Sequence, residues 1–265
     1  MPFVSVRDRR FHYREHGVGD ELILFIHGNL ASGRWWEPVI SRLPTERYRM
    51  VAPDLRGCGQ SDKPETGYTV PEMAEDVRAF VATIGLCSFH LVGHSMGGAI
   101  ALLYALDHPT TVRSLTLIAP VPPEGLTLPE DLYPLMQQMR VDRARLCEGF
   151  MEFLPAMAHE NLLEALVDDA LACHPACFDE LPRSFEMLRF ADRLEELRAP
   201  TLIVWGEEDR LISRPAMERL HEAIPGSRLE ILPGVGHGPQ VEAPDQLSRL
   251  LAQFFREISP RRRKP

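Results

Sequence analysis

Short, almost continuous apolar runs alternate along the chain with longer segments whose apolar positions recur at helical spacing. Six apolar runs predict strands, at residues 21–27, 48–53, 89–93, 112–120, 200–206 and 227–234. Five segments predict helices, at residues 33–43, 70–85, 95–109, 214–225 and 243–258. The first run is apolar throughout most of its length, as expected of a strand buried on both faces. This alternation predicts an α/β fold, with a mostly parallel sheet and helices on both faces.

Two shorter segments, 3–6 and 10–15, precede these runs and predict a hairpin. The 265 residues suffice for one large α/β domain or for two small ones. We find no internal repeat and no low-complexity tract.

Residues 121–198 interrupt the alternation, because they contain no good strand. Prolines divide this stretch, which predicts several helices separated by turns. Its position between two predicted strands indicates a helical cap, or lid, inserted in a core of residues 1–120 and 199–265. A second helical domain without a role in binding is the alternative. Large apolar side chains in the stretch predict an apolar pocket, although most should pack between cap and sheet; they include Leu132, Met136, Met139, Phe150, Phe153, Met157 and Phe185.

Charge and composition argue against several classes of function. A net charge of −9 disfavours nucleic acids and anionic membranes as partners, and the basic run 261–265 is expected to be a solvated, frayed end. No stretch is apolar enough for a signal peptide or a membrane span. Five cysteines without a secretory signal indicate reduced thiols and a cytoplasmic protein. The segment CHPAC, 173–177, is a single cysteine pair, so we predict no metal site there.

The segment Gly93-His94-Ser95-Met96-Gly97 fits the pattern G-x-S-x-G between a predicted strand and a predicted helix. Such a sharp turn strains the backbone at the serine, and the two glycines leave room for the close approach of neighbouring backbone. Backbone N–H groups at the start of the helix favour developing negative charge. Ser95 is therefore the candidate nucleophile.

A serine hydroxyl needs a base, and ten histidines compete for that role. His237 lies in a loop between the last predicted strand and the last predicted helix, from which a side chain can reach the top of the sheet. His94, beside the serine, is expected to give structural support. The base needs a carboxylate that fixes its tautomer. Asp209, just after the strand at 200–206, is our choice, and Glu208 is the alternative.

An oxyanion hole would complete the site. Met96 follows the nucleophile and can supply one backbone N–H. The loop after the first buried strand, with His27 and Gly28, supplies the other. Asn29 is the expected second donor, through its backbone N–H, with its side chain as a further donor.

Together these residues resemble the α/β-hydrolase fold superfamily, in its serine esterase and lactonase branch. The segments HGNLASGRWW, PDLRGCGQSD, GHSMGG, VWGEEDR and PGVGHGPQVEAP resemble family motifs and occur in the right order. The chain order Ser95, Asp209, His237 also matches the family. The likeness covers nearly the whole chain, and 121–198 lies where the family inserts its lid. Residues 54–62 are expected to brace the edge of the active site.

Several branches of the family carry other residues at key positions than this chain does, and these differences narrow the range of expected reactions. Dehalogenases and epoxide hydrolases of this fold use aspartate where the chain has Ser95. Carbon–carbon bond hydrolases often carry asparagine before the serine and tryptophan after the histidine, where this chain has His94 and Gly238. Lipases that act at oil interfaces usually need a secretory route. An intracellular esterase or lactonase of small to medium, partly apolar substrates remains, with carbon–carbon hydrolysis as the alternative.

The expected reaction is acyl transfer to water through an acyl-enzyme, with a small-molecule ester or lactone as substrate and no metal or organic cofactor. Peptide hydrolysis and peracid formation would use the same triad, so the sequence leaves them open. A small-molecule receptor on the same fold is the alternative of another class. Turnover of a generic ester would separate a receptor from an enzyme.

Overall fold

The computed structural model describes residues 2–259, and the basic run 261–265 lies outside that range. Eight strands form one sheet in the order β1-β2-β4-β3-β5-β6-β7-β8. The first two strands pair antiparallel, β2 pairs antiparallel with β4, and all later pairs are parallel. The strands are β1 (Phe3–Val6), β2 (Arg9–His16), β3 (Glu21–Ile26), β4 (Tyr48–Pro53), β5 (Phe89–His94), β6 (Val112–Ile118), β7 (Thr201–Gly206) and β8 (Arg228–Leu232).

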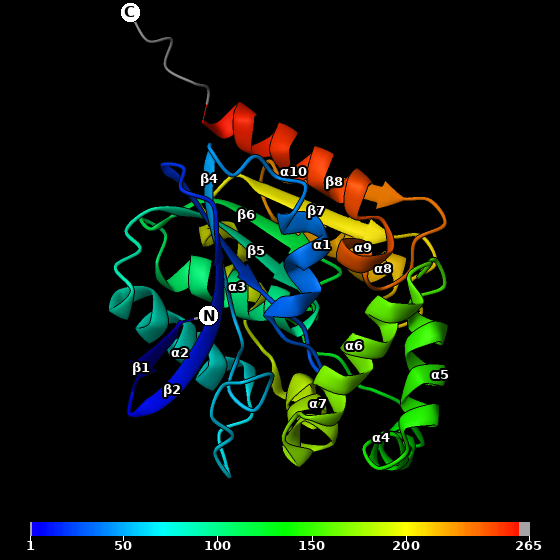
Figure 1. Cartoon of the computed structure of the whole chain (residues 1–265). Helices are drawn as coiled ribbons and strands as arrows, with labels where there is room; N and C mark the ends of the chain where they lie inside the picture. Colours follow the sequence, from blue (N-terminus) through cyan, green and yellow to red (C-terminus); the bar gives the residue numbers. More distant parts are fainter. Residues whose placement is uncertain (1, 260–265) are drawn as a thin grey trace, which may run out of the picture.

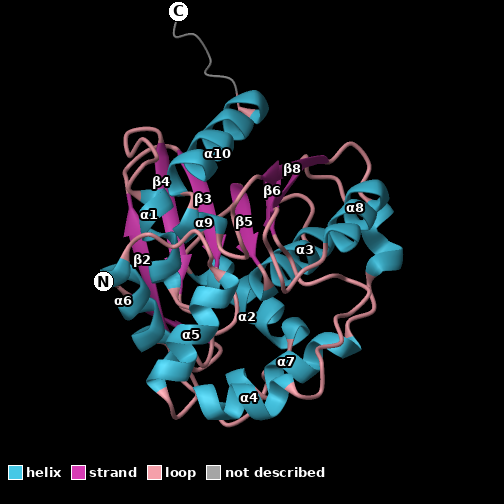
Figure 2. Cartoon of the chain, turned by 90° about the vertical axis from the view of Figure 1, so that its right-hand side faces the viewer, coloured by secondary structure: helices cyan, strands magenta, loops and turns pink. Residues whose placement is uncertain are grey.

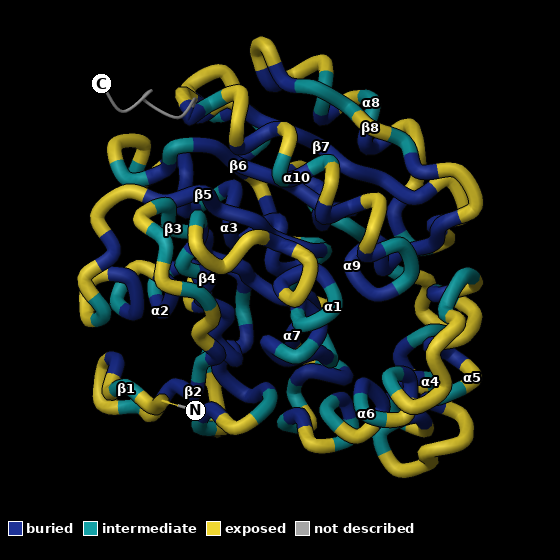
Figure 3. Tube along the Cα trace, turned by 45° about the horizontal axis from the view of Figure 1, so that its top comes forward, coloured by how far each residue is buried: buried dark blue, intermediate teal, exposed yellow. Residues whose placement is uncertain are grey.

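Helices cover both faces of the sheet, which confirms the predicted fold class. On one face α1 (Glu37–Ile40) and α10 (Pro244–Ile258) share an apolar cluster with alternate residues of β3 and β7. On the other face lie α2 (Val70–Thr83), α3 (Met96–Asp107) and α8 (Arg214–Ala223). The central strands are buried almost throughout, as Figure 3 shows, because both faces are covered.

The chain leaves the sheet after β6 and returns to it at β7. The helices between these strands are α4 (Leu132–Met139), α5 (Arg143–Phe153), α6 (Glu160–Leu171) and α7 (Glu180–Ser184), with 3-10 turns at η2 (Pro175–Phe178), η3 (Phe185–Met187) and η4 (Ala191–Glu196). Figures 1 and 2 show α4 to α7 gathered beyond the carboxyl ends of the central strands. Their buried side chains join the cluster that contains α3, so apolar packing is continuous from sheet to insertion. Over residues 2–259, no helix is long and apolar enough to cross a membrane.

The predicted helix at 33–43 is shorter and more irregular than expected. It consists of a 3-10 turn, η1 (Gly33–Trp36), followed by the single turn of α1. Pro38 lies in the first turn of α1, where a missing N–H costs nothing, and Pro44 follows soon after its end. The apolar pattern located the segment but could not define its hydrogen bonding.

Candidate active site

The turn between β5 and α3 holds Ser95 in a strained conformation. Its backbone has φ 52° and ψ −119°, a region that residues other than glycine rarely adopt. A Cβ atom on Gly93 would lie 2.2 Å from the Gly97 carbonyl oxygen, and one on Gly97 would lie 2.3 Å from the His27 oxygen. The Ser95 N–H donates to the Ile118 carbonyl at 2.9 Å, so β6 supports the turn. The two glycines thus allow the packing that places the hydroxyl at the sheet's edge.

His237 and Asp209 come together from two loops at the carboxyl end of the sheet. The Nδ1 atom of His237 lies 2.8 Å from Oδ2 of Asp209, and both side chains are buried. The other carboxylate oxygen of Asp209 accepts the N–H groups of Leu211 and Ile212, at 2.8 and 3.0 Å. The alternative acid, Glu208, is exposed to solvent. The structure therefore brings Asp209, and not its neighbour, to the histidine.

The contacts of Asp209 keep it ionised. Burial alone would raise the pKa of this carboxyl group, but the charge and hydrogen bond of His237 oppose that effect. Hydrogen bonds from Ile212 and Leu211 add to the opposition, and together these interactions hold the pKa of Asp209 below its usual range. An ionised Asp209 requires the proton of His237 to sit on Nδ1, which leaves Nε2 as the basic nitrogen.

The loop that carries His237 is fixed by contacts the sequence did not predict. The carboxylate of Glu242 accepts the N–H groups of Gly236 and Gly238, on either side of the histidine, at 3.0 and 2.9 Å. It also accepts the N–H of Ala156, from the insertion, at 2.9 Å. The His237 N–H itself donates to the Phe153 carbonyl at 2.8 Å. Glu242 lies in the motif segment PGVGHGPQVEAP, but the motif gave it no role, because its partners are backbone atoms.

His94 supports the same loop from below. Its Nε2 lies 2.8 Å from the carbonyl oxygen of His237, and its ring stacks on Trp35 at 5.9 Å between centroids. Burial is the main reason that the pKa of His94 falls to about 3, so its imidazole is neutral at physiological pH. His94 thus supports the His237 loop through a hydrogen bond to its backbone and through stacking on Trp35, and His94 also lines the pocket.

The predicted oxyanion residues flank the serine. Met96 begins α3, and Asn29 lies in the loop after β3, where Leu30 has φ 52°. The side-chain amide of Asn29 donates to the carbonyl of Cys177 at 2.8 Å, so it is engaged with the insertion. That contact uses one of the two amide N–H groups, so the backbone N–H is the stronger candidate for the oxyanion donor. Among the described residues, the Asn29 N–H makes no backbone hydrogen bond in the loops and turns.

Two further contacts tie this loop to the segment after β4. His27 donates from Nδ1 to the Gly28 carbonyl at 2.7 Å, and its Nε2 accepts the Leu55 N–H at 2.9 Å. The carboxylate of Asp54 accepts the N–H of Gly33 at 2.8 Å and the N–H of Gln60 at 2.9 Å. These bonds explain how residues 54–62 brace the edge of the site.

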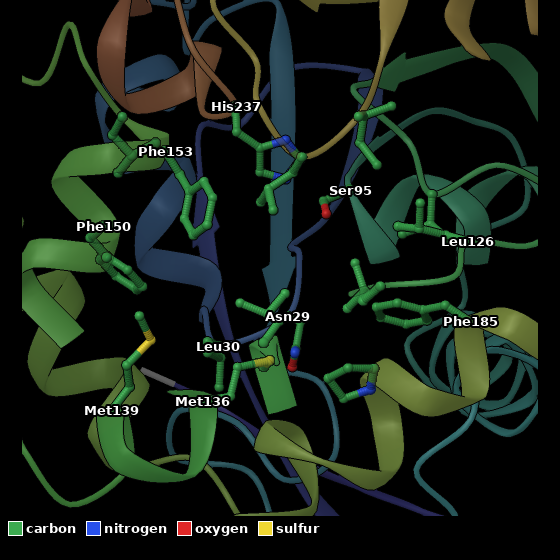
Figure 4. A pocket seen from close by; sticks show the side chains of 18 of the residues that line it. Asn29, Leu30, Ser95, Leu126, Met136, Met139, Phe150, Phe153, Phe185 and His237 are labelled. Atoms are coloured by element: carbon green, nitrogen blue, oxygen red, sulfur yellow. The ribbon is translucent and has the colours of Figure 1, made fainter. Parts of the chain in front are cut away.

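A pocket opens above Ser95, between the sheet and the inserted helices (Figure 4). It holds about 950 Å³ of empty space, part of it continuous with solvent. Ser95 and His237 lie next to one another at its wall, and Asn29 lies below them in Figure 4. Within residues 2–259 the lining contains no lysine, arginine, aspartate or glutamate, and most of it is apolar; it includes Leu126, Leu132, Met136, Met139, Leu146, Phe150, Phe153 and Phe185.

Comparison with known proteins places this site in a family context. A family model described as the alpha/beta hydrolase fold matches residues 21–244. A 2-hydroxy-6-oxononadienedioate/2-hydroxy-6-oxononatrienedioate hydrolase from Dechloromonas aromatica is 28% identical, over 94% of this chain and 91% of its own. An esterase from Exiguobacterium antarcticum superposes with a TM-score of 0.86 at 28% identity, covering 95% and 98% of the two chains. Est816, an N-acyl homoserine lactone degrading enzyme, gives 0.82 at 27% identity, covering 96% and 100%.

Proposed function

The chain belongs to the α/β-hydrolase fold family, and we propose that it is a serine hydrolase that cleaves carboxylic esters or lactones with an apolar acyl group. In this proposal Ser95 is the nucleophile, His237 the base and Asp209 the residue that orients the base. The N–H groups of Asn29 and Met96 form the oxyanion hole. Residues 121–198 act as a cap that closes the acyl pocket.

The geometry supports a two-step acyl transfer. His237 takes the hydroxyl proton as Ser95 Oγ attacks the substrate carbonyl, and it then gives that proton to the leaving alcohol. Asp209 remains ionised and stabilises the imidazolium that forms. The developing oxyanion would lie at the start of α3, whose first residue is Met96, and would accept the N–H of that residue. In the second step His237 activates water, which releases the acid and restores the serine.

The apolar pocket is the observation that carries the choice of substrate. The curated relatives act on a dienedioate, whose two carboxylates are negatively charged at neutral pH. A buried carboxylate needs a cationic or hydrogen-bonded partner, and the described lining offers no lysine or arginine. The esterase and the lactonase among the structural relatives have substrate classes without that need. The lack of charged side chains in the described lining therefore favours neutral acyl groups.

The test is steady-state hydrolysis of p-nitrophenyl esters from acetate to laurate. We expect repeated turnover by the wild type and a loss on the order of a million-fold in kcat for Ser95→Ala. Ser41→Ala, which changes an exposed serine, serves as the matched control and should retain full activity. A single burst without turnover would contradict the proposal and favour a receptor.

Carbon–carbon hydrolysis is the second candidate, and the curated relatives are its support. The same preparation should be assayed with a 2-hydroxy-6-oxodienedioate and with its neutral diester. If the dianionic compound is cleaved at carbon–carbon with the higher kcat/KM, ester hydrolysis is not the main activity. We expect kcat/KM for the dianion to lie well below that for a medium-chain ester.

A further inference from the structure

Three buried cysteines from distant parts of the chain meet at the junction of the sheet and the insertion. Cys58 comes from the loop after β4, and Cys173 and Cys177 come from the segment between α6 and α7. Their sulfur atoms all lie within 4.8 Å of one another. The exposed fractions are 0%, 7% and 0%, and none of the three lines the catalytic pocket. The sequence showed only the pair, because Cys58 joins it through the fold.

We propose that Cys58, Cys173 and Cys177 form a closed three-sulfur site for a soft, thiophilic metal ion. Thiolate ligands select soft ions such as Cu⁺ and Zn²⁺. Sulfurs that share one ion at about 2.3 Å lie roughly 4 Å apart, so the observed spacing needs little movement. Each cysteine that binds the ion releases its thiol proton to solvent, and no oxidant or reductant is involved.

The backbone around the cysteines holds the two segments together without an ion. The N–H of His174 donates to the Gly57 carbonyl at 2.8 Å, next to Cys58. The ring of His174 stacks on Tyr68 with centroids 4.9 Å apart and an angle of 6° between planes. Its Nδ1 accepts the N–H of Ala176 at 3.2 Å. The sulfurs are thus brought together by bonds that do not depend on them, which lowers the cost of ordering a metal site.

The number of ligands favours Cu⁺ over Zn²⁺. Among the described residues, no histidine, carboxylate or further cysteine joins the three sulfurs within the same distance. Structural zinc sites are almost always four-coordinate, with a fourth cysteine or a histidine. An ion that is stable with three sulfurs suits this site better. Zn²⁺ would have to recruit a water molecule into buried surroundings.

The experiment uses the full chain, purified without oxygen and with all thiols reduced. Cu⁺ and Zn²⁺ are added separately in competition with a coloured chelator, and bound metal per chain is measured. We expect one Cu⁺ per chain, a weaker site for Zn²⁺, and a loss of Cu⁺ affinity of more than about 100-fold in Cys58→Ser. Cys87→Ser, which changes an exposed cysteine, should bind like the wild type.

Several results would overturn the proposal. These are no binding of either ion, or equal binding of Cu⁺ by Cys58→Ser and the wild type. If Cys58→Ser fails to fold, X-ray absorption of the Cu⁺-loaded wild type decides: a shell of three sulfurs supports the site, and oxygen or nitrogen ligands refute it. These measurements do not use ester hydrolysis, so their outcome is independent of the proposed function.

Discussion

At the scale of single residues, the site depends on which atom each side chain offers. Asp209 uses one carboxylate oxygen for His237 and the other for two backbone N–H groups, so the carboxylate cannot rotate without losing bonds. Glu208 lies beside it and is exposed. Asp209 and Glu208 are both carboxylates, but only Asp209 is buried against His237. Substitutions at the two positions therefore test the environment of the acid rather than its chemistry.

Asp209→Asn should lower kcat for ester hydrolysis by about ten-thousand-fold while leaving KM nearly unchanged. The amide keeps the size of the side chain but favours the wrong tautomer of His237, because it can present an N–H to Nδ1. Steady-state kinetics on a p-nitrophenyl ester measure the change. Glu208→Gln is the control and should keep the wild-type rate. Comparable losses in both variants would show that the acid has been misassigned.

At the scale of elements, apolar periodicity located the strands and most helices, because burial on two faces or on one stripe leaves a strong pattern. The positions of residues 21–27 and 89–93, for example, agree with β3 and β5 within a residue or so. The serine turn was also predictable, because strand, turn and helix follow one another in the sequence. Contacts between distant segments were not, as Glu242 and Cys58 show. The contact of Glu242 with the Ala156 backbone leaves no pattern of residue types, and Cys58 lies far along the chain from Cys173 and Cys177.

The inserted helices are expected to set the preferred acyl length. Met139, on α4, is buried and lies across the pocket from Ser95 in Figure 4. Met139→Ala should enlarge that end, so the ratio of kcat/KM for octanoate to that for butyrate should rise by at least about tenfold, since one methylene is worth about 1–3 kcal/mol in such pockets. Met187→Ala changes an exposed methionine of the same insertion and should leave the ratio unchanged. A shift toward shorter chains would show that acyl groups bind elsewhere.

At the scale of the whole molecule, buried neutral histidines couple stability to pH. His94 lines the pocket next to Ser95, and His90 lies on β5 against Phe255. Burial is the main cause that lowers the pKa of each to about 3, and the charges of Arg113 and Arg47 add to the effect at His90. In the unfolded chain a histidine takes up a proton near pH 6.5. The folded state therefore binds fewer protons between these values than the unfolded state.

The free energy of unfolding should fall as the pH drops below about 6.5, by about 1 kcal/mol per pH unit for each of the two histidines. Their stabilising effect is present in full above pH 6.5 and is lost toward pH 3. Urea unfolding between pH 7 and pH 5 measures the slope. The hydroxyl of Ser114 lies 2.7 Å from Nδ1 of His90, and His90→Asn keeps a polar partner for it. This variant should take up one proton fewer on unfolding, so its free energy of unfolding should depend less steeply on pH. His16→Asn changes an exposed histidine and should show the same pH dependence as the wild type. Parallel curves for all three proteins would refute this account.

The insertion contacts the loops of His237 and Asn29 through backbone atoms, and these contacts bear on any exchange of the insertion. The Phe153 carbonyl and the Ala156 N–H contact the loop of His237, directly and through Glu242. The Cys177 carbonyl holds Asn29. A recombination that replaces residues 121–198 would remove these three contacts with the loops of His237 and Asn29. If the proposed function holds, crossover points that retain 153–156 and 173–177 and exchange only α4 and the first turns of α5 are expected to change the pocket lining and keep these contacts.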